Sequence, residues 1–230
     1  MYLRKCIQDY GLIEENDVIT VGLSGGKDSL VLLYGLRKLM DFYPVHFSLR
    51  ACTVDPGFGT DYSPLSRFSE SLGIPYTIEH TEIWPVITAR NEAHPCALCA
   101  NMRRGALVNG ALAQNSAKIA LAHHKDDYLS TLMMSLLFEG RFYTFAPMTR
   151  YEDREVRIIR PMLYVPEGAI RNIAEELSLP VLKNPCPMDH RTKREEMQEL
   201  ISSLQKQYPD IKDRLLHAVE TSDIPDWKEL

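Results

Sequence analysis

Apolar residues follow two alternating periods along most of the chain. Residues 18–23 (VITVGL) are mostly β-branched or aliphatic, which is typical of a buried strand, and residues 30–36 then place leucines at helical spacing. Strands that alternate with helices predict an α/β fold with a doubly wound parallel sheet. Further strands are predicted at residues 46–54, 74–80, 118–122 and 156–159, with helices at 65–72, 100–115 and 128–138.

The C-terminal third of the chain has a different pattern. It is predicted to be helical, with an interruption at residues 179–188 and two final helices at 191–206 and 209–221. We expect residues 1–190 to form one domain and residues 191–230 to be a helical tail of that domain. The 230 residues, 45% of them hydrophobic and 25% charged, are enough to bury a substantial core.

A glycine turn joins the first predicted strand to the first helix. Residues 24–29 (SGGKDS) place two glycines beside two serines, a lysine and an aspartate. Backbone N–H groups in such a turn, together with the positive end of the helix dipole, converge on one point where an anion is stabilised. An ordinary βα turn that needs glycine is the alternative, but it would not require these polar neighbours. We therefore expect a phosphate-binding site here.

The spacing of this turn argues against the Walker type of phosphate loop. That loop has four residues between its glycines and a serine or threonine directly after its lysine. Here three residues separate Gly22 from Gly26, and Asp28 follows Lys27. A kinase or GTPase loop is therefore disfavoured.

Polar residues also end the second predicted strand and follow the fourth. In doubly wound folds the carboxyl ends of the strands are where nucleotides bind. Thr53 and Asp55 end the second strand and are expected to face the adenine or the ribose, although a plain turn explains them nearly as well.

Residues 123–127 (HHKDD) come directly after the fourth strand, where charged groups are costly to bury. His123 is expected near the nucleotide, and Asp127 or Asp28 near a magnesium ion, because magnesium prefers carboxylate and phosphate oxygens. A solvated helix start capped by Asp126 or Asp127 is the alternative.

Three of the five cysteines are placed where they could share a metal. Cys96 and Cys99 are three residues apart, a spacing that puts both sulfurs on one side of a helical turn. Cys186 lies between two prolines, which favour a loop able to reach an ion or a cluster. Cys6 and Cys52 fall in an amphipathic helix and a strand, where a free cysteine is a small core hydrophobe. An odd number of cysteines argues against a disulfide framework.

The loop SGGKDS resembles the SGGxDS signature of the PP-loop ATPases, which split ATP into AMP and pyrophosphate. The strings CALCANMRRG, AHHKDDYLSTLMMSLLFEG and IRPM and a late cysteine follow in the order seen in tRNA 2-thiocytidine biosynthesis enzymes, over residues 18–215. In that family ATP activates a cytidine of the tRNA anticodon loop. Three cysteines hold a 4Fe-4S cluster whose fourth iron is free to carry sulfur. The resemblance therefore implies an ATP-dependent tRNA thiolation enzyme.

The same resemblance implies roles by position. Residues 24–29 would bind ATP with its Mg²⁺. Together with the position of Asp127 after the fourth strand, this makes Lys27, Asp28 and Asp127 the candidate catalytic residues. The three metal-site cysteines would hold the cluster, and the absence of a second late CxxC suits an iron left open to sulfur. The sulfur donor would be a cysteine desulfurase or sulfide. The nucleotide-binding set is Ser24, Gly25, Gly26, Lys27, Asp28, Ser29, Thr53, Asp55 and His123.

Charge limits how such a protein could hold a tRNA. The net charge is −5, and residues 195–230 account for all of it with nine acids against four bases, whereas residues 1–194 are balanced. RNA phosphates must therefore be bound by local basic patches, although a solvated protein face is the commoner explanation of such patches. The candidate RNA-binding residues are Arg103, Arg104, Arg141, Arg160, Arg191, Lys193 and Arg194.

Two other classes of protein share parts of this pattern. A PP-loop ligase or amidase with a structural zinc would add His94 or His190 to the three cysteines as a fourth, closed ligand. A nucleotide sensor would bind ATP without cleaving it. The serine-rich loop and the acids after the fourth strand argue against the sensor.

The sequence also predicts where the protein works. The charged N-terminus is unlike a signal peptide, and no apolar run approaches the ~20 residues of a membrane span. We therefore expect a cytoplasmic protein that does not bind membranes. A homodimer is an open alternative to a monomer.

Overall fold

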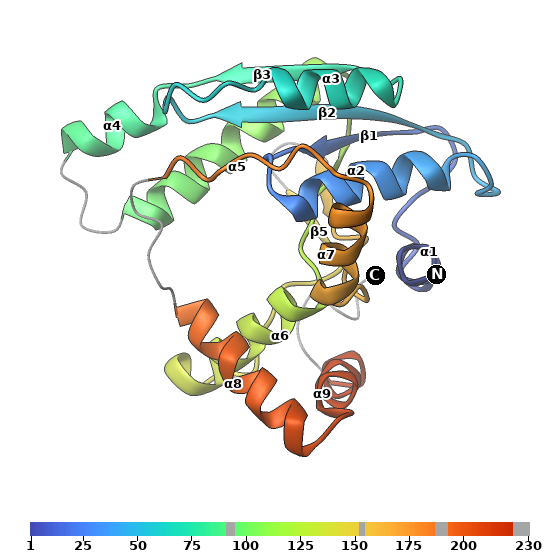
Figure 1. Cartoon of the computed structure of the whole chain (residues 1–230), viewed down its shortest axis with the longest axis vertical. Helices are drawn as coiled ribbons and strands as arrows, with labels where there is room; N and C mark the ends of the chain where they lie inside the picture. The colour runs from blue at the N-terminus through green and yellow to red at the C-terminus, as the bar shows by residue number, and fades with distance from the viewer. Residues whose placement is uncertain (91–94, 152–154, 187–192, 223–230) are drawn as a thin grey trace.

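The computed structural model describes residues 1–90, 95–151, 155–186 and 193–222 and contains a six-stranded sheet (Figure 1). The strands are β1 (Asp17–Gly22), β2 (Phe47–Asp55), β3 (Tyr76–His80), β4 (Lys118–Ala120), β5 (Met148–Tyr151) and β6 (Val156–Ile159). Their order is β3-β2-β1-β4-β6-β5. All pairs are parallel except β5 with β6 at one edge. The predicted α/β fold with a doubly wound sheet is confirmed, and the short, polar β5 is an addition that its sequence did not signal.

The helices cover both faces of this sheet and extend beyond it. Most were expected, but α4 (Ile83–Arg90) was not, because its β-branched residues and Pro85 disfavour a helix. Pro85 is tolerated because it lies in the first turn.

In the described part of the chain, no helix is long and apolar enough to span a bilayer. The helices are α1 (Tyr2–Asp9), α2 (Lys27–Leu39), α3 (Ser63–Ser71), α4 (Ile83–Arg90), α5 (Pro95–Ala113), α6 (Lys125–Met134), the π-helical turn η1 (Ser135–Glu139), α7 (Glu167–Glu176), α8 (Lys193–Gln207) and α9 (Ile211–Glu220).

The chain changes direction across the sheet between β1 and β4. β2 and β3 lie on one side of β1, and β4 and β6 lie on the other, so the carboxyl ends of β1 and β4 flank a topological switch point. Ligands of doubly wound sheets bind in the crevice at such a point. Figure 1 shows α5 crossing the sheet, whereas α8 and α9 lie away from it against α6. The fold therefore predicts a site between β1, β4 and α5.

The core is built from the apolar faces of β1 and α2. Ile19, Val21 and Leu33 are completely buried, as the alternating pattern requires. Cys6 and Cys52 are 0% and 1% exposed, which confirms that both are core residues.

One glycine lets α5 lie close to the sheet. A Cβ on Gly110 would be 2.7 Å from the Glu79 side chain and 3.0 Å from Cys52 Sγ, so a larger residue would push α5 away from β2 and β3. This close packing sets the position of the N-terminal half of α5, which carries two of the predicted metal-site cysteines and two of the predicted RNA-binding arginines.

Candidate nucleotide and metal site

Two serines and a left-handed glycine shape the loop between β1 and α2. Gly25 has φ +86°, a conformation that glycine adopts without strain. Ser29 Oγ donates to the carbonyl oxygen of Gly26 at 2.9 Å and lies 3.2 Å from Ser24 Oγ. These bonds fold the loop over the first turn of α2, whose N–H groups have no intrahelical partners. The loop therefore has the geometry of the predicted phosphate site.

Lys27 is held at this loop by two carboxylates. Its Nζ lies 2.9 Å from Asp28 Oδ1 and 3.3 Å from Glu167 Oε1 at the start of α7. Burial lowers the pKa of Lys27, but the hydrogen bond and charge of Asp28 and the charge of Glu167 outweigh it, so the pKa is raised overall. Lys27 therefore carries a full positive charge beside the loop at neutral pH.

His124 lies between the two aspartates predicted to be catalytic. Its Nε2 is 3.4 Å from Asp127 Oδ2 and 3.9 Å from Asp28 Oδ1, and its side chain is buried. The backbone N–H of His124 also donates to Asp127 Oδ2 at 3.2 Å, so Asp127 caps α6 as well as approaching the loop. The sequence prediction chose His123 of the histidine pair and missed His124. The doublet itself, directly after a buried strand, was the signal for both.

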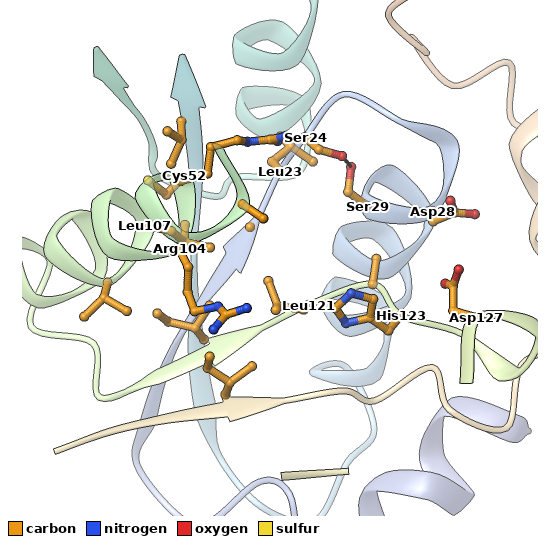
Figure 2. Close-up of a pocket in the computed structure, with 18 of the residues that line it drawn as sticks. Leu23, Ser24, Asp28, Ser29, Cys52, Arg104, Leu107, Leu121, His123 and Asp127 are labelled. Atoms are coloured by element: carbon orange, nitrogen blue, oxygen red, sulfur yellow. Dashed lines mark hydrogen bonds between the residues drawn. The ribbon is translucent and has the colours of Figure 1, made fainter. Parts of the chain in front are cut away.

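A cavity of about 380 Å³ opens at the carboxyl ends of β1, β2 and β4, at the predicted switch point. Figure 2 shows Ser24, Ser29 and Asp28 at its edge, with Asp127 next to Asp28 and Arg104 of α5 across from them. This volume is typical of a small-molecule site. Its remaining walls include Leu23, Cys52, Val54, Ala100, Arg103, Leu107, Leu121, His123 and Arg194.

Thr53 and Asp55 lie beside the cavity, whereas Val54 of the same strand lines it. Thr53 is 1% exposed, and its Oγ1 donates to the carbonyl oxygen of Leu23 at 2.6 Å, which ties β2 to the start of the loop. Asp55 lies 3.1 Å from His80 Nδ1. Both residues thus stabilise the walls in this structure, and a direct contact with ATP stays a prediction.

His123 lines the cavity as an uncharged imidazole. Burial and the positive charges of Arg160 and Arg194 lower its pKa to about 3. The ring packs against Phe145 with the centroids 4.9 Å apart. Its buried Nδ1 has no hydrogen-bond partner among the described residues. A neutral imidazole of this kind is able to exchange one hydrogen bond with a ligand in the cavity.

Arg160 lies behind His123 and is buried. Its Nη1 donates to the carbonyl oxygen of Ala146 at 2.7 Å and to Thr149 Oγ1 at 2.9 Å, and its guanidinium lies 5.1 Å from the centre of the Phe145 ring. Burial lowers the pKa of Arg160 to about 10. With 8% of its surface exposed, Arg160 holds a loop together, and this placement does not support the RNA contact expected from the sequence.

The other basic residues divide between the cavity and the surface beside it. Arg103, Arg104 and Arg194 line the cavity, and Arg194 Nη1 lies 3.7 Å from Asp127 Oδ1. Lys193 Nζ lies 5.4 Å from the centre of the Phe138 ring. Arg191 falls outside the described residues. The predicted basic patch is therefore centred on the cavity, with its outer part near η1.

The cysteines of the predicted metal site come from two segments. Cys96 and Cys99 lie at the start of α5, and Cys186 follows α7 after an irregular stretch that Figure 1 shows running toward α5. Burial raises the pKa of the Cys99 thiol, Arg103 opposes this effect, and the charges of Cys186 and Cys96 raise the pKa further. Cys99 is therefore close enough to both other thiols to interact with them electrostatically.

The exposure of the three cysteines is compatible with a bound cluster. Cys96 is exposed and the other two cysteines are partly exposed, so all three are accessible to a ligand. Among the described residues no three His, Cys, Asp or Glu side chains already form a compact metal-ion site. His94 and His190, the expected fourth ligands of a structural zinc, lie outside those residues. Three spaced thiols suit a 4Fe-4S cluster with one open iron.

The loop and the switch-point cavity define a nucleotide-binding protein of the PP-loop class. The family model described as a PP-loop domain matches residues 2–204. The chain belongs to this family.

Two relatives and one solved structure are similar to the chain over most of its length. The chain is 34% identical over 220 residues to the tRNA-cytidine(32) 2-sulfurtransferase of Pelobacter propionicus, covering 94% of this chain and 82% of that protein. It is 36% identical to the protein of the same name from Geotalea uraniireducens, covering 94% and 87%. Among solved structures, the U34-tRNA thiolase NcsA from Methanococcus maripaludis with its 4Fe-4S cluster is similar, with a TM-score of 0.75 and 26% identity over 95% of this chain and 76% of that one.

Proposed function

We propose that this protein is a cytoplasmic, ATP-dependent tRNA sulfurtransferase that converts a cytidine of the anticodon loop, at position 32, into 2-thiocytidine. One observation carries the proposal. The phosphate loop and the cysteine-bearing helix α5 line the same cavity, and Arg103 and Arg104 are among the residues by which α5 lines it. This arrangement supports ATP activation at one side of the pocket and sulfur delivery from the side of α5.

The first step activates the base. The C2 oxygen of the cytidine attacks the α-phosphorus of ATP, an O–P bond forms, and the bond from the α-phosphorus to the bridging oxygen breaks to release pyrophosphate. Lys27 and the N–H groups of the loop stabilise the phosphate charge, with phosphate oxygens taking the place of Glu167. Asp28 and Asp127, which both approach His124, are the carboxylates that would hold Mg²⁺.

The second step replaces oxygen by sulfur. A sulfide nucleophile forms a C–S bond at C2, and AMP leaves with the former C2 oxygen. A 4Fe-4S cluster bound to Cys96, Cys99 and Cys186 would supply an open iron that holds the sulfide. Arg103 favours the thiolate form of Cys99 and lines the cavity. We propose that the sulfide comes from a cysteine desulfurase or from the free sulfide pool.

The surface that we propose for tRNA runs from the cavity to the turn after α6. Arg194 lines the cavity, Lys193 beside it lies over the ring of Phe138, and Arg141 lies 4.5 Å from the centre of the Tyr143 ring. Unpaired bases of an RNA loop stack on aromatic rings and arginine planes. Large apolar side chains are exposed throughout residues 136–143, called here the aromatic segment: Leu136, Leu137, Phe138, Phe142 and Tyr143.

The nucleotide products test this function. Anaerobic protein is incubated with ATP, Mg²⁺, sulfide and a tRNA transcript, and the matched control transcript carries uridine in place of cytidine 32. We expect AMP and pyrophosphate in equal amounts, with a rate that depends on cytidine 32. ADP and phosphate as products, or equal rates with both transcripts, would overturn the proposal.

A further inference from the structure

The segment that carries Cys186 is anchored to the nucleotide loop through Leu182. Within residues 181–185, Leu182 is half-buried and the other four residues are exposed. The backbone N–H of Leu182 donates to the carbonyl oxygen of Gly25 at 2.9 Å. This bond joins two parts of the chain that are more than 150 residues apart in the sequence.

The side chain of Leu182 also covers Gly25. A Cβ on Gly25 would lie 3.1 to 3.2 Å from three carbons of the Leu182 side chain. Gly25 is the residue whose left-handed backbone creates the turn of the loop. A change in the loop therefore moves the surface on which Leu182 rests, and a displaced Leu182 removes a support from the loop.

The other end of this short segment is held as well. The backbone N–H of Cys186 donates to Asn184 Oδ1 at 3.2 Å, a side-chain turn that, with the fixed φ of Pro185, limits the directions in which Cys186 can point. Four residues reach at most about 14 Å when fully extended. The connection from Gly25 through Leu182 to the thiol of Cys186, which interacts with Cys99, is therefore short and allows Cys186 little movement.

We propose that Leu182 is a positioning residue that couples ATP binding to cluster binding. Nucleotide at residues 24–29 stabilises Leu182 and holds Cys186 where it binds iron, and the bound cluster favours the loop conformation that binds ATP. The inference rests on the proposed function, because it requires ATP at the loop and a cluster at the three cysteines. Coupling between two binding equilibria is reciprocal, so each ligand raises the affinity for the other by the same factor.

The affinity for ATP, measured by titration calorimetry under anaerobic conditions, tests the coupling without turnover. Cluster-loaded wild-type protein is expected to bind ATP at least about fivefold more tightly than metal-free protein. In Leu182→Ala we expect the cluster-loaded form to bind ATP less than about twofold more tightly than the metal-free form. Val181→Ala, a neighbouring exposed position, is the matched control and keeps the wild-type ratio.

A second variant separates coupling from local packing. Insertion of two glycines between Lys183 and Asn184 leaves the contact of Leu182 with Gly25 but lengthens the connection to Cys186. We expect its metal-free form to bind ATP like wild type, with no gain when the cluster is loaded. The inference is overturned if loading the cluster raises the affinity for ATP in both variants as much as in wild type. It is also overturned if loading the cluster leaves the affinity of the wild-type protein for ATP unchanged. Failure of wild type to bind iron or ATP at all refutes the proposed function, and the inference with it.

Discussion

At the scale of single residues, Lys27 is predicted to supply the positive charge of the phosphate loop. Lys27 is about 30% exposed between Asp28 and Glu167, so its removal costs little stability, because exposed ion pairs contribute little. We predict that Lys27→Met lowers kcat/KM for AMP release by about 100-fold or more, since charge stabilisation in the transition state is lost. Lys5→Met, at an exposed lysine of α1, is the control. AMP release at the wild-type rate would remove Lys27 from the catalytic step.

The half-buried His123 is predicted to make stability depend on pH. Its pKa is lowered to about 3 in the folded protein, whereas the unfolded chain titrates near 6.5. Between these values the unfolded chain binds a proton that the folded chain does not, so the free energy of unfolding falls as the pH falls. We predict that His123→Phe makes this dependence shallower, by up to about 1.4 kcal/mol per pH unit. Urea unfolding between pH 4 and pH 6.5 measures the free energy of unfolding of both proteins. The same dependence on pH in wild type and His123→Phe would contradict the prediction.

At the scale of elements, the start of α5 and the segment after α7 are predicted to bind one cluster together. We predict that anaerobic protein holds about four iron atoms per chain. Alanine at Cys96, Cys99 or Cys186 is expected to abolish iron binding, because a cluster with three protein ligands needs all of them. Cys6→Ala and Cys52→Ala keep the iron, since both thiols are buried in the core. Iron analysis and visible absorbance test this, and colourless protein with one zinc per chain would contradict it.

The aromatic segment after α6 is predicted to bind unpaired bases. Phe138→Ala combined with Phe142→Ala should weaken tRNA binding by about 30-fold or more, because each lost base stack costs roughly 1–3 kcal/mol. The salt dependence of binding should not change, because no phosphate contact is removed. Phe42→Ala, at an exposed ring after α2, is the matched control. Fluorescence anisotropy of labelled tRNA measures the affinity. An unchanged affinity with an altered oligomeric state would assign the segment to a contact between copies of the chain.

Local patterns predicted the elements that carry the phosphate site, and tertiary contacts supplied the rest. The apolar run of β1 and the glycines of the loop are local signals, so residues 24–29 could be found directly. The role proposed for Leu182 could not be predicted from the sequence, because it depends on a contact with Gly25, more than 150 residues away along the chain. Arg160 could not be separated from surface arginines for the same reason, since only the fold shows that it is buried.

At the scale of the whole molecule, the C-terminal helices complete the site. Lys212 of α9 pairs with Asp126, and Lys125 pairs with Asp213, so α9 is joined to the start of α6 beside the aspartate predicted to be catalytic, Asp127. α8 packs on α6 and brings Arg194 into the cavity. The phosphate loop, Asp28 and Asp127, and the arginines of α5 and α8 thus line one pocket, and Cys96 and Cys99 lie at the start of the same helix α5.

The most direct measurement of the proposed activity is the nucleoside content of tRNA. Total tRNA from cells with and without this gene is digested and analysed by mass spectrometry, and cells carrying Asp28→Asn or Cys186→Ala provide matched controls. We predict 2-thiocytidine only in cells with the wild-type protein. An unchanged thionucleoside profile after loss of the gene would contradict it.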